Sequence, residues 1–235
     1  MTKLADSVVL VTGANGGLGT EFVRQALARG ARRVYATARA PRTWDDDRVV
    51  PLVLDVTDGA SVAEAASAAD DTTIVINNAG GTAGSSLLAA SLDEVRAAYE
   101  TNVFGPIAVA QAFAPLLARN GGGTLIDIHS ALSWLAMPGA YSSTKAALWS
   151  VTNTLRLELA AQGTAVVGAH LGYTDTPMTA GLDVDKADPR DIVAAIYDGL
   201  EAGELEILAD DTSRWVKQQL SEPLTALYPQ LAPAT

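Results

Sequence analysis

The sequence predicts an α/β fold: a single Rossmann-type, doubly wound parallel sheet of about seven strands with helices on both faces. Short continuous apolar runs, typical of strands buried on both faces of a parallel sheet, alternate along the chain with segments of helical periodicity. Polar and glycine-rich clusters follow several of these runs, and such sheets bind ligands at the carboxyl ends of their strands. The length of 235 residues fits one domain, spanning 1–235.

The apolar runs place the predicted strands at 8–11, 33–37, 49–54, 73–76, 124–128, 165–171 and 205–209. Helical periodicity predicts helices over about 18–30, 61–69, 92–119, 141–162 and 188–203. Ser91 and Glu94 form a capping box at the start of the long third helix. We expect Pro106 to bend that helix or to unsettle one of its turns, because proline lacks an N–H donor.

Composition excludes several function classes. The net charge of -11 and the absence of basic runs argue against binding to nucleic acid or an anionic membrane. Without cysteine there are no disulfides, thiolate metal sites or thiol nucleophiles, and two histidines offer little for a metal site. Asp6 interrupts the N-terminal apolar stretch, and the apolar segment 103–118 is shorter than a membrane span. We therefore expect a soluble, cytoplasmic protein without a metal.

A glycine-rich turn over 12–19 follows the first predicted strand and precedes a helix. Its glycines allow a sharp turn and a close approach of the backbone to a pyrophosphate, to which the helix N-terminus presents unpaired N–H groups. Glycine turns also join strands to helices in proteins that bind no ligand. The candidate cofactor-binding residues here are Gly13, Asn15, Gly16, Gly17, Leu18 and Gly19.

Tyr141 and Lys145 lie four residues apart in a predicted helix, so both side chains leave the same helix face. A positive charge beside a phenol favours the phenolate, and we expect it to lower the pKa of Tyr141 toward the range of a general acid or base. The same spacing arises often by chance in ordinary helices. The pair therefore needs companions before it indicates a catalytic site.

Those companions occur in order over about residues 6–178: the G-x-x-x-G-x-G turn, 78–80 (Asn-Ala-Gly), Asn102, Ser130 and Tyr141-x-x-x-Lys145. Together they resemble the short-chain dehydrogenase/reductase family. The resemblance implies a nicotinamide cofactor and hydride transfer to or from a carbonyl carbon. It also implies that relatives commonly assemble as homodimers or homotetramers through their long helices, where the chain offers Phe113, Leu116, Leu148, Trp149 and Leu155.

By this resemblance, Tyr141 is the proton donor in reduction, and Lys145 binds the nicotinamide ribose and lowers the pKa of the tyrosine. Ser130 holds the substrate oxygen, and Asn102 holds a water that connects Lys145 to solvent. Asn102 could instead satisfy a kinked backbone near Pro106. Ser130 lies eleven residues before Tyr141, a shorter loop than the family usually has, and Ser133 is the nearby substitute.

The resemblance also assigns residues around the cofactor. It places Asn78, Ala79 and Gly80 along the adenosine side and Asp55 near adenine, although Asp55 could cap a turn while Val56 contacts the base. After the sixth strand, Leu171 replaces the usual proline, and the hydroxyl of Thr176 matches the group that contacts the nicotinamide carboxamide. Gly172 and Thr174 complete this set.

The end of the second strand reads Thr37, Ala38 and Arg39, where an NAD enzyme commonly has a carboxylate for the ribose 2′-hydroxyl. An uncharged position followed by arginine suits the 2′-phosphate of NADP through charge-assisted hydrogen bonds. Arg39 could also be merely solvated, like Arg42. We predict NADP as the cofactor.

The substrate is less defined. Under the family geometry, an apolar pocket would be lined by Trp134, Leu135, Met137, Tyr173 and Met178, although a core contains the same residue types. We expect an NADP-dependent carbonyl reductase or alcohol dehydrogenase acting on a ketone or aldehyde with bulky apolar groups. A non-catalytic NADP-binding sensor or scaffold of the same fold is the alternative, and dehydration or epimerisation is a third possibility. His129 and His170 are expected to be packed residues.

Overall fold

The computed structural model describes residues 2–82, 84 and 86–232 of the chain. Seven strands form one sheet in the order β3-β2-β1-β4-β5-β6-β7, and every neighbouring pair is parallel. The predicted fold class is therefore confirmed. The strands are β1 (Val8–Val11), β2 (Arg33–Ala38), β3 (Val49–Val53), β4 (Ile74–Asn77), β5 (Thr124–Ile128), β6 (Ala165–His170) and β7 (Glu206–Leu208).

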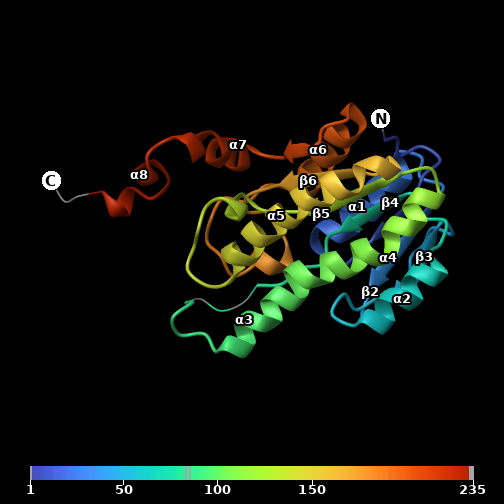
Figure 1. The fold of residues 1–235 in the computed structure, drawn as a ribbon, viewed down its shortest axis with the longest axis horizontal. Coiled ribbons are helices and arrows are strands. Elements are labelled where there is room, and N and C mark those ends of the chain that lie inside the picture. The colour runs from blue at the N-terminus through green and yellow to red at the C-terminus, as the bar shows by residue number, and fades with distance from the viewer. Residues whose placement is uncertain (1, 83, 85, 233–235) are drawn as a thin grey trace.

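Helices cover both faces of the sheet (Figure 1). Alternate residues of β1 point to opposite sides, so Val9 and Val11 join one buried cluster while Val8 and Leu10 join another. On the first side lie α1 (Gly17–Ala28) and α6 (Pro189–Ala202); on the second lie α2 (Gly59–Ala68), α4 (Gly105–Arg119) and α5 (Tyr141–Glu158). Strands buried on both faces explain the continuous apolar runs.

The long helix beside the sheet changes its winding in the middle. It begins with α3 (Leu92–Tyr99) at the Ser91–Glu94 capping box, passes through a π-helical turn at Glu100–Phe104, and continues as α4. In the π turn, the Gly105 N–H bonds to the Glu100 carbonyl five residues earlier. Pro106 follows immediately and has no N–H to donate to the preceding turn, which explains the change of winding there. The expected unsettled turn is present.

The same helix, Leu92–Arg119, is the one stretch of the described residues that is long and apolar enough for a membrane span, at 28 residues. The apolar segment 103–118 lies within this longer helix. Its apolar character has a local explanation, because Val109, Phe113 and Leu117 are buried against the sheet.

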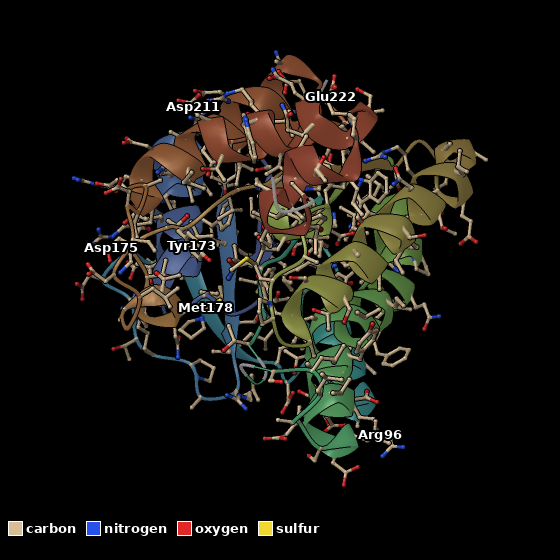
Figure 2. All side chains as sticks on the ribbon, turned by 90° about the vertical axis from the view of Figure 1, so that its left-hand side faces the viewer. Arg96, Tyr173, Asp175, Met178, Asp211 and Glu222 are labelled. Atoms are coloured by element: carbon tan, nitrogen blue, oxygen red, sulfur yellow. The ribbon has the colours of Figure 1, made fainter. Side chains whose placement is uncertain are left out.

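The chain ends in short helical segments that pack near the carboxyl edge of the sheet. They are α7 (Asp211–Gln218), α8 (Leu224–Leu227) and 3₁₀ turns at Gln219–Ser221 and Pro229–Leu231. Figure 2 labels Asp211 and Glu222 on this segment, at the opposite end of the view from Arg96 of α3. The backbone N–H of Ala136 donates to the Tyr228 hydroxyl at 2.7 Å. Further 3₁₀ turns occur at Ala131–Ser133, Ala160–Gln162 and Pro177–Thr179.

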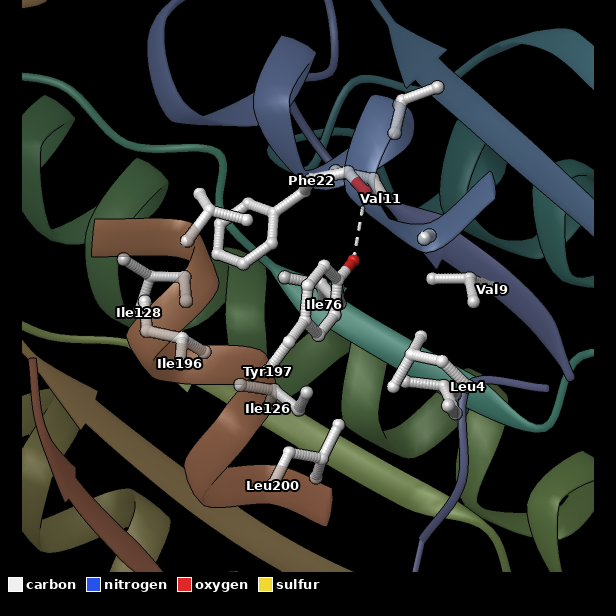
Figure 3. Packing of buried hydrophobic residues seen from close by; sticks show 14 of the residues in the cluster. Leu4, Val9, Val11, Phe22, Ile76, Ile126, Ile128, Ile196, Tyr197 and Leu200 are labelled. Atoms are coloured by element: carbon white, nitrogen blue, oxygen red, sulfur yellow. Dashed lines mark hydrogen bonds between the residues drawn. The ribbon is translucent and has the colours of Figure 1, made fainter. Parts of the chain in front are cut away.

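Tyr197 of α6 anchors the first layer of helices. Its ring is fully buried and meets the ring of Phe22 edge-on, with centroids 5.6 Å apart (Figure 3). Its hydroxyl donates to the Phe22 carbonyl at 2.9 Å, so the buried phenol is satisfied. This contact fixes α6 against α1, the helix that follows the glycine-rich turn.

Two residues of the proposed subunit interface are placed differently from expectation. Phe113 and Leu148 have exposed fractions of 0% and 1%, so they belong to the core of one chain and cannot form a contact between chains. Their helices are apolar on the sheet-facing side, and periodicity alone does not distinguish that side from an interface.

Gly19 is required by close packing in the turn before α1. A Cβ added there would lie 2.2 Å from the Gly13 carbonyl oxygen, whereas one added at Gly16 would meet nothing within 4 Å. We predict that Gly19→Ala lowers the free energy of unfolding by about 1–3 kcal/mol, as overpacking does. Gly16→Ala is the matched control and should cost less, about 0.5–1 kcal/mol, because alanine is a poorer helix N-cap than glycine but meets no clash. Urea unfolding measures both, and equal losses would contradict the packing argument.

Candidate active site

The expected catalytic residues lie at the carboxyl edge of the sheet. Tyr141 is the first residue of α5, Lys145 lies one helical turn later, and Ser130 follows β5 by two residues. The helix α5 packs against β6 and the turn at 131–133, so its first turn faces the end of β5. These three side chains are brought together, whereas Asn102 approaches from the long helix through Thr144.

Lys145 is a buried cation at the end of β5. Its Nζ donates to the Ile128 carbonyl at 2.7 Å and lies 5.7 Å from the centroid of the Tyr141 ring. Burial lowers the pKa of Lys145 to about 8, and the charge of Asp127 opposes that shift. The ammonium is thus fixed beside the phenol by a backbone group of the sheet.

Burial raises the pKa of Tyr141 to about 12, and a hydrogen bond from Ser130 opposes that shift. The pKa of Tyr141 therefore shifts opposite to the expected direction, because desolvation of the phenol outweighs the effects that favour the phenolate. The Lys145 ammonium is bound to the Ile128 carbonyl, and its charge does not outweigh the desolvation of the phenol. Consequently Tyr141 is protonated at neutral pH and can act as an acid.

Ser130 reaches Tyr141 in spite of the short loop. It caps the 3₁₀ turn at 131–133, and its Oγ accepts from the Leu132 N–H at 3.1 Å. With Oγ engaged as an acceptor, its hydrogen is directed toward Tyr141. Ser133, the alternative, is buried, and its Oγ faces the Ser130 N–H at 3.5 Å. The geometry therefore favours Ser130 over Ser133 as the partner of the tyrosine.

Asn102 is buried inside the π turn and ties three segments together. Its Nδ2 donates to the Gly81 carbonyl at 2.8 Å and to Thr144 Oγ1 at 3.0 Å, and its Oδ1 accepts from the Gly81 N–H at 2.9 Å. These bonds join the long helix to the loop after β4 and to α5. The water-binding role stays a prediction, while the structural role is visible in these contacts.

Thr12 organises the cofactor-binding edge, a role that the sequence analysis missed. Its Oγ1 accepts from the N–H groups of Asn78 and Ala79, each at 2.9 Å. Asn78 Nδ2 donates in return to the Thr12 carbonyl at 2.8 Å. Asn78 therefore holds the end of β4 against the glycine-rich turn. A buried hydroxyl directly after the first strand was the available signal.

The N-terminus of α1 is suited to an anion. Its cap residue Gly16 makes no side-chain hydrogen bond, and the first turn carries no acidic residue. Gly13 and Gly17 have φ values of +67 and +51, which favour glycine. The Cβ of Thr176 would lie 3.2 Å from a Cβ at Gly17, so the segment after β6 borders this turn. An open, uncapped helix end between these segments fits the pyrophosphate of a dinucleotide.

The end of β2 brings two arginines to the same edge. Arg39 is exposed, it forms no hydrogen bond or ion pair with the residues that the structure describes, and its charge lowers the pKa of Asp55. Arg42 is not merely solvated: its guanidinium lies 4.1 Å from the Trp44 ring centroid and donates to Thr20 at 3.3 Å. Sequence reasoning had not singled out this second cation beside the glycine-rich turn.

Asp55 has a turn-forming role in addition to any contact with a ligand. Its Oδ1 accepts from the Thr57 N–H at 3.0 Å and from the Thr57 hydroxyl at 2.7 Å, and these bonds lower its pKa. Val56 is buried against Gly105 of α4. The turn-capping alternative is thus present in the structure, and adenine contacts by either residue stay a prediction.

The five predicted pocket residues separate into two groups. Trp134, Leu135 and Met137 line a hollow of about 460 Å³ beside α5, together with residues that include Leu87, Leu88, Ser142, Ser143 and Ala146. Tyr173 and Met178 do not line it; they are exposed on the segment between β6 and α6 (Figure 2). That segment also carries Gly172 and Thr174, of which Thr174 is buried.

The buried ammonium generates a prediction about stability. The pKa of Lys145 falls from 10.5 to about 8 on folding, so between these values the unfolded chain binds a proton that the folded chain does not. Stability therefore rises with pH in this window, by up to about 3 kcal/mol from this group. Urea unfolding of the wild type and Lys145→Met at pH 7.5 and 9.5 measures the difference. Identical pH slopes in the two proteins would refute the assignment.

Comparison with known proteins agrees with this geometry. The sequence model of the short chain dehydrogenase family matches residues 7–187. An uncharacterized oxidoreductase of Staphylococcus aureus is 33% identical over 213 residues, which cover 83% of this chain and 91% of the relative. A short-chain dehydrogenase of Talaromyces islandicus is 37% identical over 180 residues, which cover 72% of this chain and 63% of the relative.

Solved structures give the same result. A short chain dehydrogenase from Burkholderia cenocepacia in complex with NADP is 35% identical, with a TM-score of 0.92 over 99% of this chain and 100% of that one. A relative from Burkholderia phymatum in complex with NAD, at 20% identity, shares the fold with a TM-score of 0.85 over 100% of both chains. The chain therefore belongs to the short-chain dehydrogenase family of oxidoreductases.

Proposed function

We propose that the protein is an NADP-dependent carbonyl reductase that converts a ketone or aldehyde with bulky apolar groups into an alcohol. The observation that carries the proposal is the arrangement of three donors at one sheet edge: the protonated phenol of Tyr141, the hydroxyl of Ser130 and the ammonium of Lys145. They lie at the same edge as the uncapped glycine turn.

In the proposed reaction, the bound nicotinamide supplies a hydride to the carbonyl carbon. Tyr141 donates its proton to the carbonyl oxygen, so that the C=O group becomes an alcohol. Ser130 donates a hydrogen bond to the same oxygen and stabilises its developing negative charge before the proton arrives. Lys145, held by Ile128, is the nearby positive charge that stabilises the phenolate left behind.

NADP is proposed over NAD because of the charges near the end of β2. Arg39 is exposed and Arg42 lies against Trp44 beside the glycine-rich turn, so two guanidinium groups are available to a 2′-phosphate. The Burkholderia cenocepacia relative binds NADP, which supports this choice, while the one from Burkholderia phymatum binds NAD.

The apolar substrate class is supported by the hollow beside α5. Its walls include Trp134, Leu135, Met137, Leu87 and Leu88. Charged side chains do not line it among the described residues, so a charged metabolite would be desolvated there without a partner. We further propose a cytoplasmic homodimer or homotetramer, which size-exclusion chromatography with light scattering tests.

One prediction concerns Tyr141 as the proton donor. Tyr141→Phe should lower the rate of ketone reduction by about 10³-fold or more, since it removes the proton donor and leaves the fold and the cofactor edge in place. The Kd for NADPH, measured by fluorescence titration, should stay within about twofold. Substantial residual reductase activity would contradict the role of Tyr141. A wild type that binds NADPH but reduces no ketone in a broad panel would instead favour the cofactor-binding sensor.

Another prediction concerns the choice between NADP and NAD. Arg39→Asp should raise the KM for NADPH by about tenfold or more and leave the KM for NADH nearly unchanged, because it replaces a phosphate partner with a repelling charge. Arg119→Asp makes the same change of charge at the far end of α4 and serves as the control. Equal losses with both cofactors, or equal effects of the two variants, would count against a 2′-phosphate site at Arg39.

A further inference from the structure

Three stacked aromatic rings form a column next to Ser130. The rings of His129 and His170 stack with centroids 4.6 Å apart, and Trp134 stacks on the other side of His170 at 3.9 Å. Lys217 of α7 covers the outer end, with Nζ 4.5 Å from the Trp134 ring centroid. Gly168 makes room for the histidines, because a Cβ there would lie 3.0 Å from the His129 ring. His170 is thus held from both faces.

The hydrogen-bond partners of His170 show which of its ring nitrogens carries the hydrogen. Its Nδ1 lies 3.3 Å from the Ser130 carbonyl oxygen, which can only accept, so Nδ1 carries the hydrogen. Its Nε2 is buried without a hydrogen-bond partner in the described part of the chain, and the nearest carboxylate oxygen, on Glu206, is 3.8 Å away. Burial lowers the pKa of His170 to about 4, so the ring is neutral near pH 7. A neutral ring with its hydrogen on Nδ1 is a donor to Ser130 alone.

Hydrogen bonds to the Ser130 carbonyl help to fix the orientation of the Ser130 hydroxyl. Besides His170, it accepts from the Ser133 N–H at 2.9 Å, which closes the 3₁₀ turn. The Leu132 N–H, one residue earlier in that turn, donates to the Ser130 Oγ. Rotation of the peptide group after Ser130 would therefore shift the turn, and with it the Leu132 N–H that bonds to the hydroxyl oxygen. The carbonyl bond from His170, which comes from the neighbouring strand, opposes that rotation.

We propose that His170 is a positioning residue that keeps the Ser130 hydroxyl aimed at the substrate oxygen by binding the Ser130 carbonyl. This inference rests on the proposed reductase function. His170 does not touch the reacting atoms, and it acts only through Ser130. The column of His129 and Trp134 fixes the plane of its ring.

A purely structural role of His170 predicts a different effect of substitutions at this position. If His170 only fills space between two rings, a phenyl ring should replace it well and a small amide should not. If it acts as a donor, asparagine should replace it better, because the amide nitrogen of asparagine lies near the position of Nδ1. The variants His170→Phe and His170→Asn therefore separate the two roles.

The kinetic test uses the ketone that the wild type reduces fastest. His170→Phe should lower kcat about tenfold, with NADPH Kd within about twofold, which corresponds to loss of one hydrogen bond that supports the transition state. His170→Asn should recover most of that loss. In a Ser130→Ala background, His170→Phe should have no further effect on kcat, because the two residues act in series. Melting temperatures of all variants identify losses that come from unfolding.

Wild-type kcat in His170→Phe combined with a loss in His170→Asn would overturn the proposal, as would multiplicative losses in the double variant. Imidazole ¹⁵N NMR of the full chain gives a test that needs no activity, because the sequence holds only two histidines and the His170→Phe spectrum assigns them. A hydrogen on Nδ1 of His170 at pH 7 supports the proposal, and a hydrogen on Nε2 overturns it. Absence of ketone reduction by the wild type would refute the proposed function. The NMR experiment would still show whether His170 donates to the Ser130 carbonyl.

Discussion

The arrangement of the site depends on one buried charge, the ammonium of Lys145. Taking a cation out of water costs several kcal/mol unless polar partners compensate. Here the Ile128 carbonyl accepts a hydrogen bond from the ammonium, and the buried Asp127 supplies an opposite charge nearby. Both partners belong to β5. The ammonium therefore joins the first turn of α5 to the end of that strand, and Tyr141, one turn earlier on the helix, is placed by the same bond.

Asp127 extends this constraint across the sheet. It accepts from Asn77 at the end of β4 at 2.9 Å and from the Thr152 hydroxyl of α5 at 2.6 Å, and burial raises its pKa. Thr152 also meets the ring of His129 at 3.0 Å. One fully buried carboxyl group thus connects two strands, α5 and, through Thr152, the stacked ring of His129. An unpaired polar group in such a buried network is costly, and the hydrogen bonds that avoid this cost make the geometry of the network specific.

Residue patterns predicted the fold well because burial on both faces of a parallel sheet leaves a direct trace in sequence. The seven apolar runs lie within a residue or two of the observed strands. The prediction that Phe113 and Leu148 lie at a subunit interface was wrong, because periodicity identifies an apolar helix face without identifying what covers it. The stacking of His129 on His170 was likewise beyond reach, since they meet only when β5 and β6 pair. The pKa of Tyr141 shifts opposite to the expected direction for a related reason. Sequence spacing shows a neighbouring charge, but it does not show the desolvation that opposes the effect of that charge.

The protonation states of the site bear on the direction of catalysis. At neutral pH, Tyr141 carries its proton, the Ser130 hydroxyl accepts from the Leu132 N–H and has its own hydrogen to donate, and Lys145, with a pKa of about 8, is largely charged. All three groups are therefore donors. A carbonyl oxygen, which only accepts, matches such a site, whereas an alcohol must also give up a proton to an acceptor. Oxidation would need the phenolate, and burial disfavours that form of Tyr141. These protonation states therefore support the carbonyl reduction that we propose.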